Sequence, residues 1–140
     1  MSISIPYGAW PILLTPFRTD GSIDWPALDQ VLDFYIERRV PGLLALGQAS
    51  EVLTLSVPEC FDIAKRVAAK CKGQVRTVAV GNYGATLDEQ ARSLTKVKDL
   101  GIDVAIVAAS LLPSADNLGE QLLQLADITN ASVPLGVYDA

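Results

Sequence analysis

The sequence is 140 residues long, half hydrophobic and 19% charged, which suits one domain with a large buried core. Its formal net charge is −5 and it has no basic tract, so we expect neither nucleic acid nor a membrane surface as a partner. It has no histidine, and Cys60 and Cys71 lie far apart on one predicted helix, so we expect no metal site, no disulfide and no histidine-based triad.

Five apolar runs rich in Val, Ile, Leu and Ala recur at a spacing of about 30 residues, the length of one strand, one helix and their turns. The runs do not alternate apolar with polar residues, which is typical of strands buried on both faces of a parallel sheet. We therefore predict strands over residues 9–15, 42–47, 75–81, 103–109 and 134–138.

The intervals between these strands carry the pattern of amphipathic helices. From Leu28 to Ile36, for example, apolar residues return every three or four positions and so share one helix face. Capping residues mark four helix starts, and two of these pair with a glutamate three residues on to form a capping box. The predicted N-caps are Asp24, Ser56, Thr86 and Asn117, with Glu59 and Glu89 completing the boxes.

This alternation of strands and helices is compatible with an open doubly wound sheet or with part of a (β/α)8 barrel. Both architectures put function at the carboxyl ends of the strands, where the apolar runs stop. These ends are residues 15–17, 47–51, 81–84, 110–113 and 138–139. Their glycine-rich turns match no nucleotide-binding fingerprint, so we expect no cofactor.

Four stretches of the sequence form an ordered set: TPF followed by DGSID, GQASE followed by LTLSVPE, VAVGNYGATLDE, and the terminal PLGVYDA. Together they resemble the dihydrodipicolinate synthase / N-acetylneuraminate lyase family of pyruvate-dependent class I aldolases. The resemblance implies a (β/α)8 TIM barrel. Residues 1–140 would be the N-terminal part of its single domain, covering about strands one to five and helices one to four. It also implies a homodimer or homotetramer.

In that family a lysine on the sixth strand attacks the keto carbon of pyruvate and forms a Schiff base, whose enamine adds to an aldehyde or leaves from one. The five lysines of this sequence all fall on predicted helices or at helix ends. The resemblance therefore implies a catalytic lysine beyond residue 140, and no activity for these residues alone. Its implied partners are a pyruvate-like keto acid and an unspecified aldehyde.

Tyr138 matches the family tyrosine that relays protons at the mouth of the barrel. Gln48 and Ala49 align with two positions that usually carry hydroxyl groups for keto-acid binding and proton relay, and Ser110 aligns with a tyrosine. We predict that these three residues contact the substrate, Ala49 through its backbone N–H. Asp139 stands where asparagine is usual. The departures indicate a divergent member of the family.

Two further residues of the GQASE turn have predicted structural roles at the site. Gly47 lets the chain turn closely, and the Glu51 carboxylate holds the turn by accepting hydrogen bonds. After the third predicted strand, Asn82 and Tyr83 either face the substrate or only form their turn.

Two alternatives stay open, and the losses at Gln48, Ala49 and Ser110 motivate the first of them. One is a non-catalytic barrel that binds a keto acid or serves as a regulatory subunit after losing the proton relay. The other is an unrelated open α/β domain that is complete at 140 residues. The N-terminus lacks a signal-peptide pattern, no apolar run is long enough to cross a bilayer, and isolated thiols suit a reducing compartment, so we expect a cytoplasmic protein.

Overall fold

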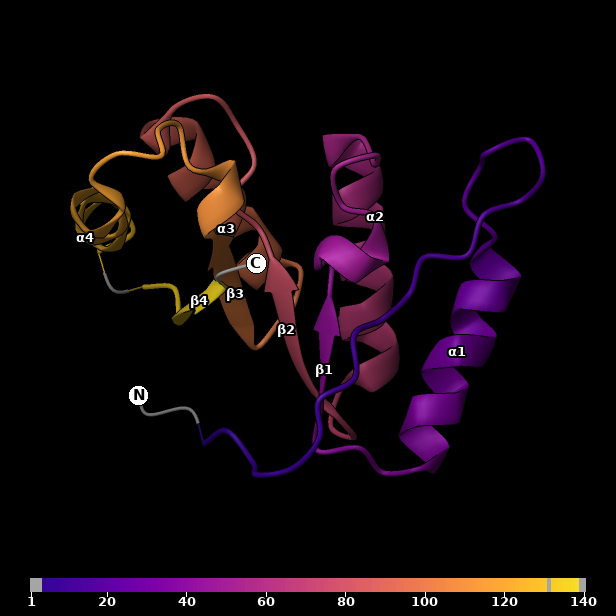
Figure 1. The fold of residues 1–140 in the computed structure, drawn as a ribbon. Coiled ribbons are helices and arrows are strands. Elements are labelled where there is room, and N and C mark those ends of the chain that lie inside the picture. The colour runs from indigo at the N-terminus through magenta and orange to yellow at the C-terminus, as the bar shows by residue number, and fades with distance from the viewer. Residues whose placement is uncertain (1–3, 131, 139–140) are drawn as a thin grey trace.

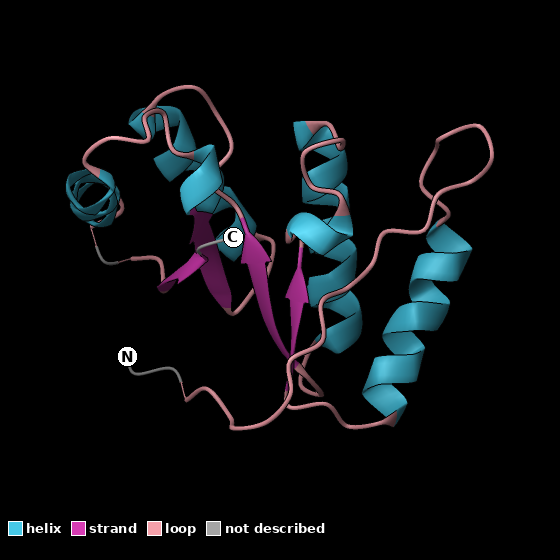
Figure 2. Ribbon diagram, in the orientation of Figure 1, coloured by secondary structure: helices cyan, strands magenta, loops and turns pink. Residues whose placement is uncertain are grey.

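A computed structural model describes residues 4–130 and 132–138, so the predicted departure at Asp139 lies outside the described residues. Helices and strands alternate along the chain (Figures 1 and 2). The helices are α1 (Trp25–Glu37), α2 (Val57–Cys71), α3 (Leu87–Asp99) and α4 (Leu118–Ile128). The strands are β1 (Gly42–Ala45), β2 (Arg76–Val80), β3 (Val104–Ala108) and β4 (Leu135–Tyr138). Short 3₁₀ turns over Gln48–Ser50 and Ala109–Leu111 follow β1 and β3.

The sheet is wholly parallel, and its strand order β1-β2-β3-β4 is the order of the chain. Right-handed crossovers between strands that advance in one direction put every helix on the same face. Accordingly α1 packs on α2, α2 on α3, and α3 on α4, and Figure 1 shows the helices following one another around the strands. A doubly wound sheet needs a reversal of strand order, which is absent from the described residues. The arrangement is the wall of a (β/α)8 barrel, and the open-sheet alternative is wrong.

The first predicted strand, residues 9–15, is wrong in its extent. Only one parallel bridge forms there, between Ile12 and Leu44. The N–H of Leu13 donates to the carbonyl of Leu44 at 2.8 Å, and the N–H of Leu44 donates to the carbonyl of Pro11 at 3.0 Å. Pro11 has no N–H of its own, so the ladder does not continue toward the N-terminus. The segment still lies beside β1, where the first strand of the barrel belongs.

The predicted helix starts are confirmed, with one difference in detail. The Asp24 side chain accepts from the N–H of Ala27, and both capping boxes form at the starts of α2 and α3. The hydroxyl and N–H of Ser56 lower the pKa of the Glu59 carboxyl in its box. Asn117 does begin α4, but in the left-handed conformation (φ 55°) and without a capping bond from its side chain.

Alternate residues of each strand face the helices. A Cβ added at Gly81 would come within 2.9 Å of Val97 on α3, so Gly81 and the residues in phase with it face the helix layer. In that phase Val107 of β3 is 1% exposed, whereas its register partner on β4, Val137, is 61% exposed. The helix-facing side of β4 is therefore uncovered within the described residues. The opposite phase, which includes Tyr138, forms the inner face of the barrel wall.

We predict that Gly42→Ala destabilises the fold. Trp10 lies directly over Gly42 at the start of β1, and a Cβ there would overlap its indole ring. The overlap should cost about 1–3 kcal/mol, because the core must shift to admit the methyl group. The measurement is the free energy of unfolding by urea.

Gly119→Ala is the matched control for this variant. Gly119 lies in α4, and a Cβ there meets nothing within 4 Å. The same added methyl should stabilise this helix by about 0.5–1 kcal/mol. Equal changes in the two variants would contradict the packing of Trp10 on β1.

Candidate active site

The carboxyl ends of the four strands meet along one edge of the sheet because all the strands are parallel. The turn after β1 brings Gln48 and Ala49 to this edge, the turn after β3 brings Ser110, and the end of β4 brings Tyr138. Neighbouring strands lie about 4.8 Å apart, so the turns after β1 and β3 are separated by about 10 Å. The predicted binding and catalytic residues thus share one edge.

The GQASE turn buries Gly47 and Ser50 and exposes its other three side chains. Gly47 is buried and extended (φ −78°, ψ −178°), and Ser50 is 1% exposed. Gln48 and Ala49 lie between them in the 3₁₀ turn with exposed side chains. Glu51 ends the turn in the left-handed conformation (φ 59°). This geometry places the exposed side chains of Gln48 and Ala49 at the edge.

A pair of hydroxyl groups ties this turn to the first segment of the chain. The Ser50 hydroxyl donates to the carbonyl of Leu13, and the Thr15 hydroxyl donates to the carbonyl of Ser50 at 2.7 Å. All three residues are buried. This latch, formed by the Ser50 and Thr15 hydroxyls, was not predicted from the sequence, although Thr15 stands where the first apolar run ends. The latch fixes where Gln48 and Ala49 lie relative to the first segment.

Glu51 stabilises the turn through its backbone. Its N–H donates to the carbonyl of Gln48, and its carbonyl accepts from the N–H and the hydroxyl of Thr54, each at 2.9 Å. Its side chain is exposed. The bracing role of the Glu51 carboxylate and the turning role of Gly47 stay predictions.

Of the two interpretations of Asn82 and Tyr83, the structure supports turn formation. Asn82 is 0% exposed and both donates to and accepts from the backbone of Ala108. Tyr83 is 8% exposed, and its hydroxyl donates to the carbonyl of Val80 at 2.6 Å. Burial raises the pKa of the Tyr83 hydroxyl, and the neighbouring Cys60 raises it further. Because its hydroxyl is buried and bonded to the backbone, Tyr83 is not a candidate for the relay.

Ser110 and Tyr138 extend the edge beyond this turn. Ser110 is exposed in the middle of the 3₁₀ turn after β3. Tyr138 is the last residue of β4 and pairs in register with Ala108. It is half-buried on the inner face and packs against the core. The substrate contacts of Gln48, Ala49 and Ser110 and the relay role of Tyr138 stay predictions.

No lysine of the chain lies at this edge, and all five fall within the described residues. Lys65 and Lys70 are on α2, Lys72 directly follows it, and Lys96 and Lys98 are on α3. Lys70 pairs with Asp33 at 2.7 Å, and Lys96 lies 4.7 Å from the centre of the Phe61 ring. The lysine amines therefore belong to the helix layer and not to the edge. Within residues 4–130 and 132–138, no three His, Cys, Asp or Glu side chains are grouped to hold a metal ion.

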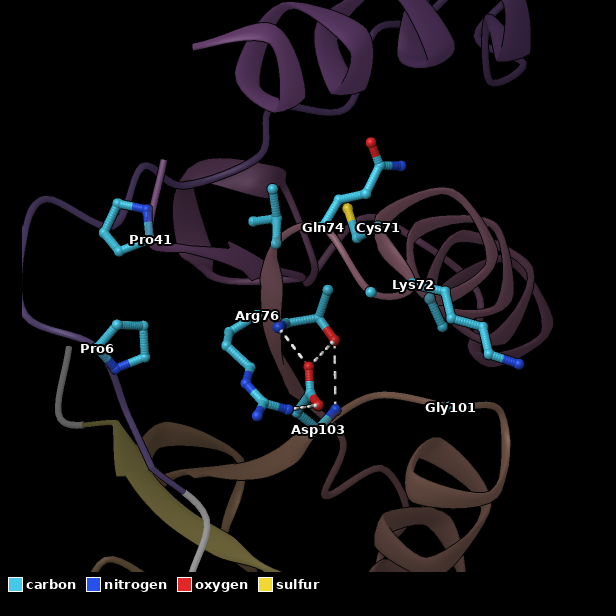
Figure 3. A pocket seen from close by; sticks show the side chains of 12 residues that line it. Pro6, Pro41, Cys71, Lys72, Gln74, Arg76, Gly101 and Asp103 are labelled. Atoms are coloured by element: carbon cyan, nitrogen blue, oxygen red, sulfur yellow. Dashed lines mark hydrogen bonds and ion pairs between the residues drawn. The ribbon is translucent and has the colours of Figure 1, made fainter. Parts of the chain in front are cut away.

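A cavity of about 420 Å³ lies at the other edge of the sheet, around the amino ends of β2 and β3 (Figure 3). Figure 3 shows Arg76 and Asp103 on one side of it and Pro6 and Pro41 on the other. Arg76 Nη1 pairs with Asp103 Oδ1 at 2.8 Å, and Asp103 Oδ2 accepts from the N–H of Thr77 at 2.8 Å. In (β/α)8 barrels, residues at the amino-terminal face contribute to stability. This ion pair therefore stabilises the contact between the amino ends of β2 and β3.

The sequence of this chain is similar to those of known proteins. The profile of the dihydrodipicolinate synthetase family matches residues 6–111, most of the chain. The chain belongs to this family. It is 32% identical over 103 residues to a 4-hydroxy-tetrahydrodipicolinate synthase of Saccharophagus degradans, covering 73% of this chain and 35% of that enzyme. It is 31% identical over 135 residues to the synthase of Pseudomonas aeruginosa, covering 94% and 45%.

Solved structures give the same fold for this member of the dihydrodipicolinate synthetase family. The dihydrodipicolinate synthase of Bacillus clausii matches with a TM-score of 0.81 at 24% identity, over 91% of this chain and 43% of that one. The synthase of Acinetobacter baumannii, solved with pyruvate, matches with a TM-score of 0.80 at 23% identity, over 94% and 45%. The chain therefore spans less than half the length of the relatives it matches.

We predict that Ser50→Ala loosens the GQASE turn. The change leaves the buried carbonyl of Leu13 without its hydroxyl donor, which should cost about 1–3 kcal/mol of stability. Backbone amides of residues 48–51 should exchange faster with deuterium than in the parent protein. Thr54→Ala is the control, because its exposed hydroxyl bond to Glu51 should cost less. Unchanged exchange in Ser50→Ala would contradict the latch.

Proposed function

We propose that this chain is the N-terminal part of a lyase or aldolase that forms a Schiff base with pyruvate or another 2-keto acid. The observation that carries the proposal is the single edge shared by Gln48, Ala49, Ser110 and Tyr138 in a barrel of this family. The nucleophilic lysine would lie beyond residue 140, since the five lysines here lie on α2 or α3 or directly after α2. A related synthase solved with pyruvate supports a keto acid as the substrate class.

Under this proposal each residue of the edge has a defined task. The amide NH₂ of Gln48, the backbone N–H of Ala49 and the hydroxyl of Ser110 are donors for the substrate carboxylate. The Tyr138 hydroxyl, on the inner face, would pass the protons that leave and return as the carbinolamine loses water. The enamine then formed at the former methyl carbon adds to the aldehyde. The 140 residues alone would be inactive, because they lack the lysine amine that forms the Schiff base.

We further propose that the complete protein is a cytoplasmic homodimer or homotetramer. The support is its family, together with apolar side chains left exposed, such as Leu53 at 66% and Leu123 at 69%. No helix in the described part of the chain has the length and apolar character to cross a membrane.

A non-catalytic barrel that binds a keto acid is the second candidate. The observation that favours it is the lack of a hydroxyl at Gln48 and Ala49. Amide and backbone N–H groups bind a carboxylate well but do not shuttle protons near neutral pH. This candidate predicts pyruvate binding without a covalent adduct.

The test is the intact mass of the full-length protein before and after incubation with pyruvate and borohydride. Borohydride reduces a Schiff base to a stable amine, so a working enzyme should gain the mass of one reduced pyruvate per chain. Peptide mapping should place the adduct outside residues 1–140. A protein that binds pyruvate yet gains no mass would fit the non-catalytic barrel, and an adduct on a lysine of α2 or α3 would contradict the proposal.

Tyr138→Phe provides a second prediction on the same full-length protein. Loss of the relay hydroxyl should slow exchange of the pyruvate methyl protons with deuterium oxide by about 10²- to 10⁴-fold, as general acid–base groups do. Proton NMR measures this exchange without knowledge of the aldehyde.

Tyr83→Phe is its control, since the Tyr83 hydroxyl is buried against the carbonyl of Val80. This variant should lower the melting temperature and leave the exchange rate unchanged. Equal exchange rates in Tyr138→Phe and the parent protein would rule out Tyr138 as the relay.

A further inference from the structure

We propose that Gln90 and Asn82 are positioning residues that together set the geometry of the candidate site. The two side chains form a buried amide pair between the sheet and α3, and they hold the turn that carries Ser110. The proposal rests on the proposed function for its catalytic meaning. The hydrogen bonds by which the pair holds this turn are seen in the structure and were not suggested by the family resemblance.

The pair begins where the β2–β3 ladder stops. The last backbone bond between these strands runs from the N–H of Gly81 to the carbonyl of Ile106 at 3.0 Å. One residue on, the Asn82 side chain replaces the backbone. Its Nδ2 donates to the carbonyl of Ala108 at 3.1 Å, and its Oδ1 accepts from the N–H of Ala108 at 2.9 Å. Asn82 thus fixes the end of β3, whose last residue pairs in register with Tyr138.

Gln90 extends the same network to two loops. It stands on α3 with 0% exposure, and its Oε1 accepts from Asn82 Nδ2 at 3.3 Å. Its Nε2 donates to the carbonyl of Gly84 at 3.1 Å and to that of Leu111 at 2.6 Å. Gly84 belongs to the loop after β2, and Leu111 closes the turn that contains Ser110. One side chain therefore joins both loops at the carboxyl edge.

The orientation of both amides is determined by their partners. The carbonyls of Ala108, Gly84 and Leu111 can only accept, and the N–H of Ala108 can only donate. Each amide consequently uses both of its N–H donors and its oxygen. A network with every donor used holds one geometry, because any other leaves a buried group unpaired.

The cost of burying two amides favours a positioning role for this pair over a purely stabilising role. Two amides buried between a helix and a sheet must recover their desolvation through hydrogen bonds, and a well-packed apolar pair at such a place is often as stable. What an apolar pair does not provide is directional bonds to two loops. The turn that carries Ser110 is held at Ala108 by Asn82 and at Leu111 by Gln90, so the pair sets where Ser110 lies relative to Tyr138.

The test compares Gln90→Met with Gln121→Met in the full-length protein. Methionine keeps the length of glutamine and removes its hydrogen bonds. Gln121 is a matched control because it is 8% exposed on α4 and its Nε2 donates to two loop carbonyls, Ser114 at 2.9 Å and Asp116 at 2.8 Å. Its loop segment lies beyond the turn that carries Ser110.

The first measurement is backbone amide exchange with deuterium. Gln90→Met should accelerate exchange over residues 108–112, whereas Gln121→Met should do so over residues 114–116 only. Gln90→Leu removes both donated bonds with another uncharged side chain and buries no charge. It should expose the same amides as Gln90→Met, and it decides the matter where that variant does not fold. Unchanged exchange over residues 108–112 in the folded Gln90 variants would overturn the proposal.

The second measurement is the rate of pyruvate methyl-proton exchange at saturating pyruvate. Gln90→Met should lower this rate about 10- to 100-fold, because a shifted Ser110 would misplace the bound pyruvate by about 1 Å relative to the reacting groups, while Gln121→Met at a similar loss of melting temperature should not. Equal rates in the two variants would reduce Gln90 to a structural residue and overturn the proposal. A parent protein that neither exchanges nor traps pyruvate would refute the proposed function instead, and amide exchange alone would then decide whether the pair holds the turn.

Discussion

The order of the strands is the constraint on which the rest of this structure depends. Each strand pairs in parallel with the one before it, and each crossover carries a helix. Since such crossovers are right-handed, a sheet that advances steadily in one direction collects its helices on one face and curves around the other. The parallel direction of the strands brings the carboxyl ends of all four described strands to one edge. Residues as distant in sequence as Gln48 and Tyr138 therefore lie along the same edge.

The two edges of the sheet are held by different chemistry. At the amino edge, a partly exposed ion pair between Arg76 and Asp103 joins β2 to β3. At the carboxyl edge, neutral groups make the ties: the hydroxyls of Thr15 and Ser50, and the buried amides of the Asn82–Gln90 pair. Neutral hydrogen bonds fix geometry without adding a charge beside the site. An anionic keto acid would then be oriented by the donors of the loops and not by a nearby structural ion pair.

Elements whose hydrogen bonds join residues close together in the sequence were predicted best. The capping boxes at Ser56 and Thr86 satisfy their bonds within four residues, so the sequence alone locates these helix starts. The first strand failed because Pro11 removes a ladder donor, an effect that a continuous apolar run conceals. The Asn82–Gln90 pair was missed for a different reason. Gln90 looks like an ordinary polar helix residue, and its partners Ala108 and Leu111 come from another turn of the chain, so only the packed fold shows that it is buried.

The residues at the described edge determine which part of the proposed chemistry this half of the barrel carries. Of its two tyrosines, Tyr83 is committed to the carbonyl of Val80 and Tyr138 stands on the inner face. Gln48 and Ala49 offer donors without a mobile proton, so under the proposed function Tyr138 carries the relay for this half of the site. Val137, on the helix-facing side of the same strand, is uncovered although its partner Val107 is buried. An uncovered edge strand favours a further βα unit over it, and under the proposed function such a unit would continue the wall toward the nucleophile.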